Sequence, residues 1–224
     1  MTMLPRHIVL LATAVTTARR WSPGIVATIF LAAFLVMACT SDAPPRPDEL
    51  RGSLLPEPLP KSDFILTTTE GESFDFRAET EGYVTLLFFG YTYCPDICPV
   101  HMANLAAVLH KLPPQTSSRI KVVMVSVDPE RDTPERFRAW LDNFDRSFVG
   151  LRGTSSELAA IQQALYLPVA VKQGEGQDYL VGHSAAVLAF TTDNLAHVRY
   201  PTGTRQADWA HDLPLLVEAL WETP

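Results

Sequence analysis

Two long apolar runs dominate the pattern of hydrophobic positions after residue 80. Residues 83–89 and 120–127 are apolar over the length of a strand, which is typical of central strands buried on both faces. Between them, residues 96–111 carry apolar side chains at helical spacing and end before Pro113 and Pro114. The pattern therefore predicts a buried strand, a helix and a second buried strand.

Shorter elements surround this centre. Residues 63–67 and 73–76 are β-prone and flank Glu70-Gly71-Glu72, so they predict a hairpin. Further along we expect a helix capped by Thr133, a strand at 148–151 and a helix at about 155–165. After a loop at 173–177 we expect paired strands at 185–191 and 196–200 and a closing helix at 207–221. Strands that alternate with helices, with a hairpin at each end, predict a three-layer α/β domain with a mixed central sheet and an N-terminal hairpin.

The first 39 residues have the pattern of an export signal. Residues 1–20 are basic without an acidic residue, residues 25–38 are apolar, and Cys39 follows. The apolar run is shorter than the roughly 20 residues of a spanning helix, and residues 36–39 resemble a bacterial lipoprotein signal. We interpret residues 1–39 as a signal peptide or lipoprotein signal with lipidation at Cys39, the alternative being an uncleaved membrane anchor. Either interpretation predicts an extracytoplasmic protein, held to the membrane on its periplasmic side.

Residues 40–60 contain six prolines among polar residues. Such a segment is extended and solvated, at about 3.1 Å per residue where it is polyproline-like. We therefore expect a tether over residues 40–60 and a domain over residues 61–224.

The charge of the exported part excludes one class of partner. Three of the 18 basic residues precede Cys39 and all 25 acidic residues follow it, so residues 40–224 have a net charge of −10. Because contacts to phosphate need cations, we expect no binding to nucleic acid.

The candidate chemistry lies where the first buried strand meets the helix, at Cys94 and Cys98. Pro95 and Asp96 favour a first helical turn, so the pattern predicts Cys94 at the N-cap and Cys98 one turn later. A helix N-terminus stabilises a thiolate and lowers its pKa. Two such sulfurs suit a structural disulfide, a redox-active pair or a soft metal ion such as copper. A structural zinc site would need four ligands, and no second cysteine pair is available to complete it.

A metal site would need a further ligand, and histidine is the first candidate. The histidines of the domain are His101, His110, His183, His197 and His211. Four of them are interpreted as structural or surface residues. His183 differs because it precedes a strongly apolar strand, where its side chain can lie over the sheet end that carries the cysteines.

At this point the sequence resembles the Sco/SenC family, the thioredoxin-like copper proteins of cytochrome c oxidase assembly. The resemblance covers roughly residues 61–222 and rests on Phe89-Gly90-Tyr91-Thr92, the segment from Cys94 to Pro99, the segment from Val125 to Pro134, the turn from Gly150 to Thr154, and His183-Ser184 before a strand.

The resemblance implies a thioredoxin-like fold and a copper site for Cu(I) or Cu(II). Cys94, Cys98 and His183 would be the ligands, with a Cys94–Cys98 disulfide when the pair is oxidised. The family delivers copper to the dinuclear copper site of cytochrome c oxidase subunit II, or reduces its cysteines. Another periplasmic copper or thiol protein is an alternative partner.

Two residues bear on whether the site binds copper as the family does. The family usually has aspartate before the histidine, and this chain has Gly182 there. Asp128 remains as a candidate carboxylate near the ligands, although a role in capping its turn is the simpler explanation. A thiol–disulfide oxidoreductase that uses Cys94 and Cys98 without an obligatory metal therefore stays open. A peroxide-reducing enzyme lacks its expected cysteine pattern in this sequence.

Overall fold

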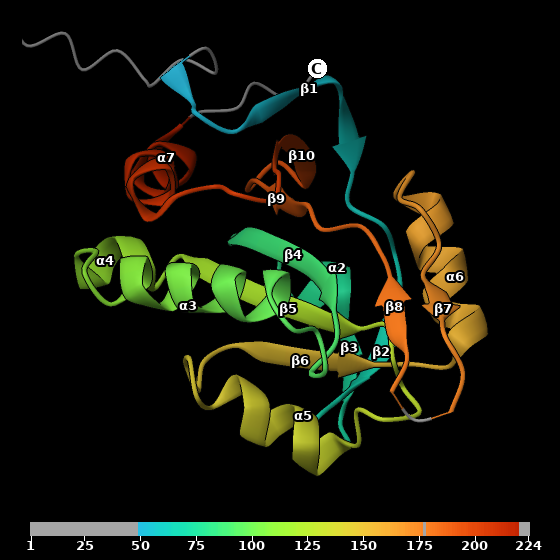
Figure 1. Ribbon diagram of the computed structural model, residues 1–224. Coiled ribbons are helices and arrows are strands. Elements are labelled where there is room, and N and C mark those ends of the chain that lie inside the picture. The colour runs from blue at the N-terminus through green and yellow to red at the C-terminus, as the bar shows by residue number, and fades with distance from the viewer. Residues whose placement is uncertain (1–48, 177, 220–224) are drawn as a thin grey trace, which may run out of the picture. The chain divides into compact units, whose positions relative to one another are not determined.

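The computed structural model describes residues 49–176 and 178–219. Eight strands form one mixed sheet in the order β1-β10-β9-β4-β5-β6-β2-β3 (Figure 1). The strands are β1 Ser53–Pro60, β2 Ile65–Thr68, β3 Ser73–Asp75, β4 Val84–Gly90, β5 Ile120–Ser126, β6 Val149–Arg152, β9 Val187–Phe190 and β10 Leu195–Tyr200, and the pair β7 Val171–Gln173 and β8 Leu180–Gly182 forms a separate hairpin.

The two apolar runs form the centre of the sheet. All seven residues of β4 are buried, and β4 pairs in parallel with β5 from Val84↔Ile120 to Gly90↔Ser126. On its other side β4 pairs antiparallel with β9. The mixed central sheet is thus confirmed, and β4 and β5 end at the same edge. The expected hairpin of β2 and β3 is also confirmed.

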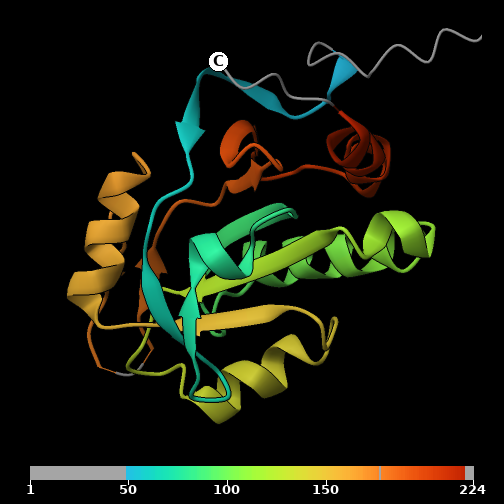
Figure 2. The same ribbon diagram turned by 180° about the vertical axis from the view of Figure 1, so that it is seen from behind.

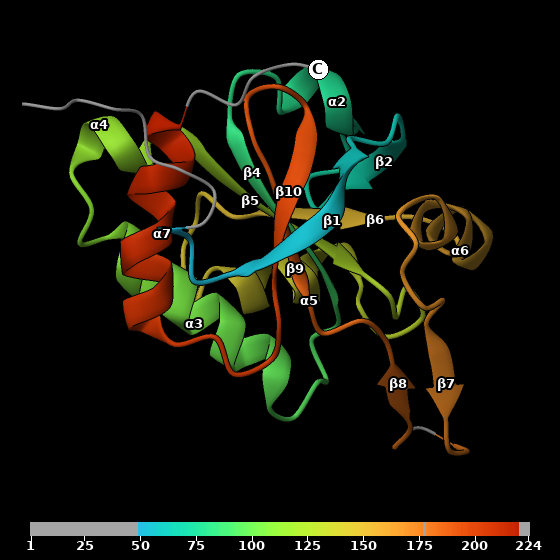
Figure 3. The same cartoon turned by 90° about the horizontal axis from the view of Figure 1, so that it is seen from above.

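The helices cover this sheet. They are α2 Phe76–Glu79, α3 Ile97–Leu109, α4 Pro114–Ser117, α5 Pro134–Leu141, α6 Ser155–Ala164 and α7 Gln206–Glu218. The helices α3 and α7 lie side by side (Figures 1 and 3). Thr133 caps α5 through the N–H of Arg136, and Thr154 caps α6 in a capping box with Glu157, as the sequence predicts.

The segment before residue 61 differs from the expected tether. Residues 53–60 form edge strand β1, which pairs antiparallel with β10 at Ser53, Leu54, Leu59 and Pro60 and shifts register between Leu54 and Leu59. Prolines that cannot donate hydrogen bonds are tolerated at a sheet edge and at such an irregularity. The chain then crosses to β2 and β3 at the other edge of the sheet (Figure 2).

A buried carboxylate holds the start of this strand. Asp212 in α7 is fully buried and accepts hydrogen bonds from the backbone N–H groups of Arg51 and Gly52 and from the hydroxyl of Tyr200. The paired strand and this anchor extend the folded domain to the N-terminal side of residue 61.

Two further sequence expectations have different outcomes. The loop predicted at 173–177 is confirmed at residues 174–176, which follow β7; the hairpin of β7 with β8 around it was not predicted, and β8 ends directly before His183. The expected export signal with Cys39 and residues 40–48 of the expected tether lie outside the described residues. None of the described helices is long and apolar enough to cross a bilayer.

Candidate metal centre

The turn between β4 and α3 positions both cysteines. The N–H of Cys94 donates to the carbonyl of Tyr91 (3.2 Å), and α3 begins at Ile97 with Asp96 as its N-cap. The prediction that Cys94 is the N-cap was therefore wrong by two residues. The reason is this turn, in which Asp96 has φ −141° and ψ −68°, outside the helical region.

The sulfur of Cys94 nevertheless accepts a hydrogen bond from the first turn of α3. The side chain of Asp96 makes no capping hydrogen bond, and the backbone N–H of Cys98 donates to Sγ of Cys94 at 3.4 Å. A free N–H of the first turn is thus paired with a sulfur that carries negative charge well.

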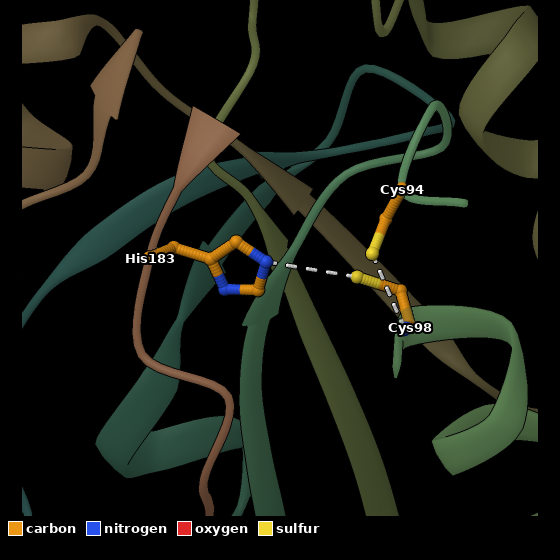
Figure 4. Close-up of side chains that lie close together, drawn as sticks. All are labelled: Cys94, Cys98 and His183. Carbon is orange, nitrogen blue, oxygen red and sulfur yellow. Dashed lines mark hydrogen bonds between the residues drawn. The ribbon is translucent and has the colours of Figure 1, made fainter. Parts of the chain in front are cut away.

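The ring of His183 approaches from the opposite side (Figure 4). Its Nε2 lies 3.8 Å from Sγ of Cys98, and its Nδ1 lies 2.8 Å from the carbonyl oxygen of Ser184. Because a carbonyl only accepts hydrogen bonds, Nδ1 carries the proton of the neutral ring and Nε2 presents its lone pair to the sulfurs. Tyr91 stands edge-on to this ring with the centroids 5.6 Å apart, which fixes its orientation.

The three ligand atoms fit one metal ion. One ligand atom each from Cys94, Cys98 and His183 lies within 4.8 Å of the others, and this is the only such cluster of three in the described part of the chain. Thiolate–metal bonds of roughly 2.3 Å place ligands in a trigonal arrangement about 4 Å apart. Cys98 is buried, whereas Cys94 and His183 are half-buried, so the site opens to solvent at these two residues.

The surroundings divide the two sulfurs into one thiolate and one thiol. A hydrogen bond from the Cys98 thiol, with further ones from the backbone N–H groups of Cys98 and Asp96, lowers the pKa of Cys94 to about 4 despite its burial. The same bond to Cys94 and burial raise the pKa of Cys98 far above its usual value. At neutral pH the two sulfurs of the metal-free pair therefore share one negative charge, which lies on Cys94.

Neither Cys94 nor Cys98 forms a disulfide in the structure. The disulfide between Cys94 and Cys98 stays a prediction for the oxidised protein.

Asp132 is a site residue that the sequence analysis missed. Its buried carboxylate accepts hydrogen bonds from the N–H and hydroxyl of Thr92 and from the hydroxyl of Ser126, the hydroxyl contacts being 2.6 Å each. It thereby ties the cysteine turn to the end of β5. The signal in the sequence was an acidic residue shortly after a buried strand, but only the fold brings it to Thr92.

Asp128 has other partners than expected. Its carboxylate accepts hydrogen bonds from the hydroxyl of Tyr179 (2.6 Å) and from Nε of Arg131 (2.5 Å). Within the described residues its side-chain hydrogen bonds do not reach Cys94, Cys98 or His183. The expected contact with a ligand therefore gains no support.

The remaining histidines lie outside the ligand cluster. His101 is 2% exposed, and its Nε2 lies 3.1 Å from the carbonyl oxygen of Ala185. His110, His197 and His211 each lie beside an aspartate, at 2.7–2.8 Å from Asp145, Asp193 and Asp212. Their interpretation as structural or surface residues agrees with these contacts.

Gly182 leaves room that another side chain fills. A Cβ at residue 182 would lie 2.4 Å from Nε2 of Gln173, on the facing strand of the β7–β8 hairpin. The amide of Gln173 thus occupies the space beside Gly182, directly before the histidine.

Comparison with known proteins points to one family. The sequence model of the SCO1/SenC family matches residues 55–218. The chain is 36% identical over 112 residues to the mitochondrial protein SCO1 homolog 1 of Arabidopsis thaliana, covering 50% of this chain and 34% of that protein. The chain spans between 34% and 63% of the length of the first curated relatives that it matches.

Solved structures give the same result. The solution structure of apo Sco1 from Thermus thermophilus has a TM-score of 0.65 at 32% identity and covers 73% of this chain and 95% of its own. The structure of Bradyrhizobium japonicum ScoI with copper bound has a TM-score of 0.63 at 29% identity and covers 70% of this chain and 99% of its own. The similarity confirms the expected thioredoxin-like fold.

Proposed function

The chain belongs to the SCO1/SenC family, and from this membership we propose that it carries copper on Cys94, Cys98 and His183. The observation that supports this most is the approach of the three ligand atoms to within 4.8 Å of one another. Two sulfurs and one imidazole form a soft donor set, which favours Cu(I), and imidazole suits copper in either oxidation state.

The acceptor in this proposal is the dinuclear copper site of cytochrome c oxidase subunit II. The cargo leaves by ligand exchange: a thiolate or imidazole of the acceptor enters at the exposed side of Cys94 and His183 while these ligands release the ion. Buried Cys98 is the last ligand to be replaced, because the other two shield it.

We also propose that the protein acts outside the cytoplasm, tethered to the membrane by a lipid on Cys39. The support is the basic, then apolar, then cysteine pattern of residues 1–39. Cys39→Ser should move the protein from the membrane fraction to the soluble fraction or leave it unprocessed. An unchanged fractionation and an unchanged mass would contradict lipidation.

The test of the metal site is titration of the reduced chain with Cu(I) in competition with a chelator. Wild type should bind one ion. His183→Ala should bind at least about 100-fold more weakly, since loss of even an outer contact to a ligand costs about 10–100-fold. His110→Ala removes an exposed histidine that pairs with Asp145 and should match wild type. Equal affinity of the wild type and His183→Ala would exclude His183 as a ligand.

A thiol–disulfide reductase is the second candidate, and the lowered pKa of Cys94 favours it. The Cys94 thiolate would attack a disulfide of subunit II to form a mixed disulfide and release one thiolate. Cys98 would then displace the second, leaving a Cys94–Cys98 disulfide and a reduced target. This reaction should persist in His183→Ala, whereas copper delivery should not.

A further inference from the structure

The turn before the first cysteine exposes an aromatic side chain. Tyr93, directly before Cys94, is 44% exposed. Large apolar side chains of this kind are enriched at protein interfaces, where tyrosine combines an apolar ring with a polar end.

Two guanidinium groups stack on the ring of Tyr93. Cζ of Arg131 lies 4.5 Å and Cζ of Arg136 lies 4.9 Å from the ring centroid. Such cation–π contacts hold a guanidinium in a fixed orientation. The turn before the cysteines therefore carries two cations fixed on its exposed ring.

The two arginines differ in exposure and in ion pairing. Arg131 has a side chain that is only 13% exposed, and it forms an ion pair with Asp128. Arg136 is exposed, and none of the ion pairs found among the described residues includes it. The guanidinium of Arg136 is thus accessible for an ion pair with a carboxylate of a partner protein.

The neighbouring carboxylates have other contacts. Glu130 pairs with Lys172 at 3.5 Å, and Glu135 is hydrogen-bonded to its own backbone N–H and to Thr133. Neither of them neutralises Arg136 by an ion pair in the described structure.

The sign of this charge is opposite to that of the exported chain. Residues 40–224 have a net charge of −10, so most of the surface repels an acidic protein, whereas Arg136 attracts one beside the metal centre. This arrangement orients an acidic partner during approach.

We propose that Tyr93 and Arg136 form the docking surface for the copper acceptor, and that the acceptor presents carboxylates beside its own metal site. This inference rests on the proposed function and adds the chemistry of the partner. The ring of Tyr93 contacts the apolar centre of the acceptor, and the guanidinium of Arg136 pairs with a carboxylate at its edge, which brings both metal sites face to face.

The test is the rate of Cu(I) transfer from the loaded full-length chain to the soluble copper domain of subunit II from the same organism, at low and high salt. Arg136→Glu is compared with Arg119→Glu. Arg119 is also exposed, but it precedes β5 at the strand end opposite to the site. The two variants change the net charge equally. Equal copper affinity of both variants and wild type verifies that the site is intact.

We expect Arg136→Glu to slow transfer at low salt by about tenfold, with the difference shrinking at high salt, because charges at the edge of an interface act mainly on association. Arg119→Glu should stay within about twofold of wild type. Equal slowing by both variants, or no slowing by Arg136→Glu, would overturn the docking surface while leaving the proposed function intact. Failure of wild type to transfer copper at all would overturn the proposed acceptor, and this surface with it.

Discussion

Nε2 of His101 lies 3.1 Å from the carbonyl oxygen of Ala185, so helix α3 is tied to the segment that carries His183. The carbonyl accepts, and Nε2–H of His101 therefore donates. Burial lowers the pKa of His101, which keeps the ring neutral and in this role at neutral pH. The helix that follows the cysteines thus also fixes the approach of His183 to them.

This contact predicts that His101→Leu weakens copper binding although His101 is not a ligand. Loss of the hydrogen bond lets residues 183–186 move, and we expect copper affinity to fall about tenfold. This is the lower end of the about 10–100-fold loss seen when a residue that holds a metal ligand in place is replaced. His101→Gln keeps a donor and should lie closer to wild type. Chelator competition measures both, and a His101→Leu affinity equal to wild type would contradict this role.

The reactivity of Cys94 should be nearly independent of pH around neutrality. With a pKa of about 4, Cys94 is already a thiolate at pH 6, so its alkylation rate by iodoacetamide should rise through pH 4 and then level off. The measurement uses a Cys39→Ser background, so that the thiols of the described site are followed alone.

A second variant identifies the cause of this shift. Cys98→Ser replaces the thiol that donates to Cys94 by a hydroxyl, and Cys98→Ala removes the donor. The midpoint should move up most in Cys98→Ala, toward the value of about 8.5 for an ordinary cysteine. A wild-type rate that still climbs between pH 7 and 9 would show that Cys94 is not a thiolate at neutral pH.

Gly90→Ala should damage both stability and the metal centre. A Cβ at Gly90 would lie 2.6 Å from Cε1 of Phe88, 2.8 Å from Cε of Met124 and 3.0 Å from Sγ of Cys98. We expect a loss of about 1–3 kcal/mol from overpacking and weaker copper binding, because the sulfur of Cys98 must move.

Gly82→Ala separates these two effects. Gly82 has φ +76° and open space around its Cα, so alanine there costs stability through backbone strain without approaching the cysteines. Urea unfolding and copper titration of both variants test the claim. Normal copper affinity in Gly90→Ala would contradict the steric link to Cys98.

Lys61 should make stability depend on pH in the alkaline range. Its side chain is 1% exposed, its Nζ donates to the carbonyl of Thr80, and burial lowers its pKa to about 8. Between pH 8 and 10.5 the unfolded chain holds a proton that the folded chain has released, so stability rises with pH in that window. The shift corresponds to about 3 kcal/mol.

Lys61→Met removes this titration, although it also leaves the carbonyl of Thr80 without its donor at every pH. The free energy of unfolding of wild type relative to Lys61→Met should therefore increase from pH 8 to 10.5, as measured by urea unfolding at several pH values. A constant difference would show that the pKa of Lys61 is not lowered.

Much of the architecture followed from local patterns. The buried strands β4 and β5, the capped helices α5 and α6 and the hairpins β2–β3 and β9–β10 were predictable because apolar period, caps and turn residues are local signals. Strand β1 was not, because its prolines favour an extended solvated segment. Only pairing with β10 and the hydrogen bonds to Asp212 place it in the sheet.

The candidate site divides in the same way. The sequence by itself determined Cys94 and Cys98, because their spacing after a buried strand is a local feature. It also made His183 a candidate through its place before an apolar strand, and the resemblance to a family strengthened that assignment. The tertiary structure decided the orientation of His183, the role of Asp132, the place of Asp128 and the exposed charge of Arg136. These depend on contacts between residues 40 to 90 positions apart, as in Thr92 with Asp132 and Cys98 with His183. No local pattern encodes such distances, which arise only when the strands pair and the helices pack.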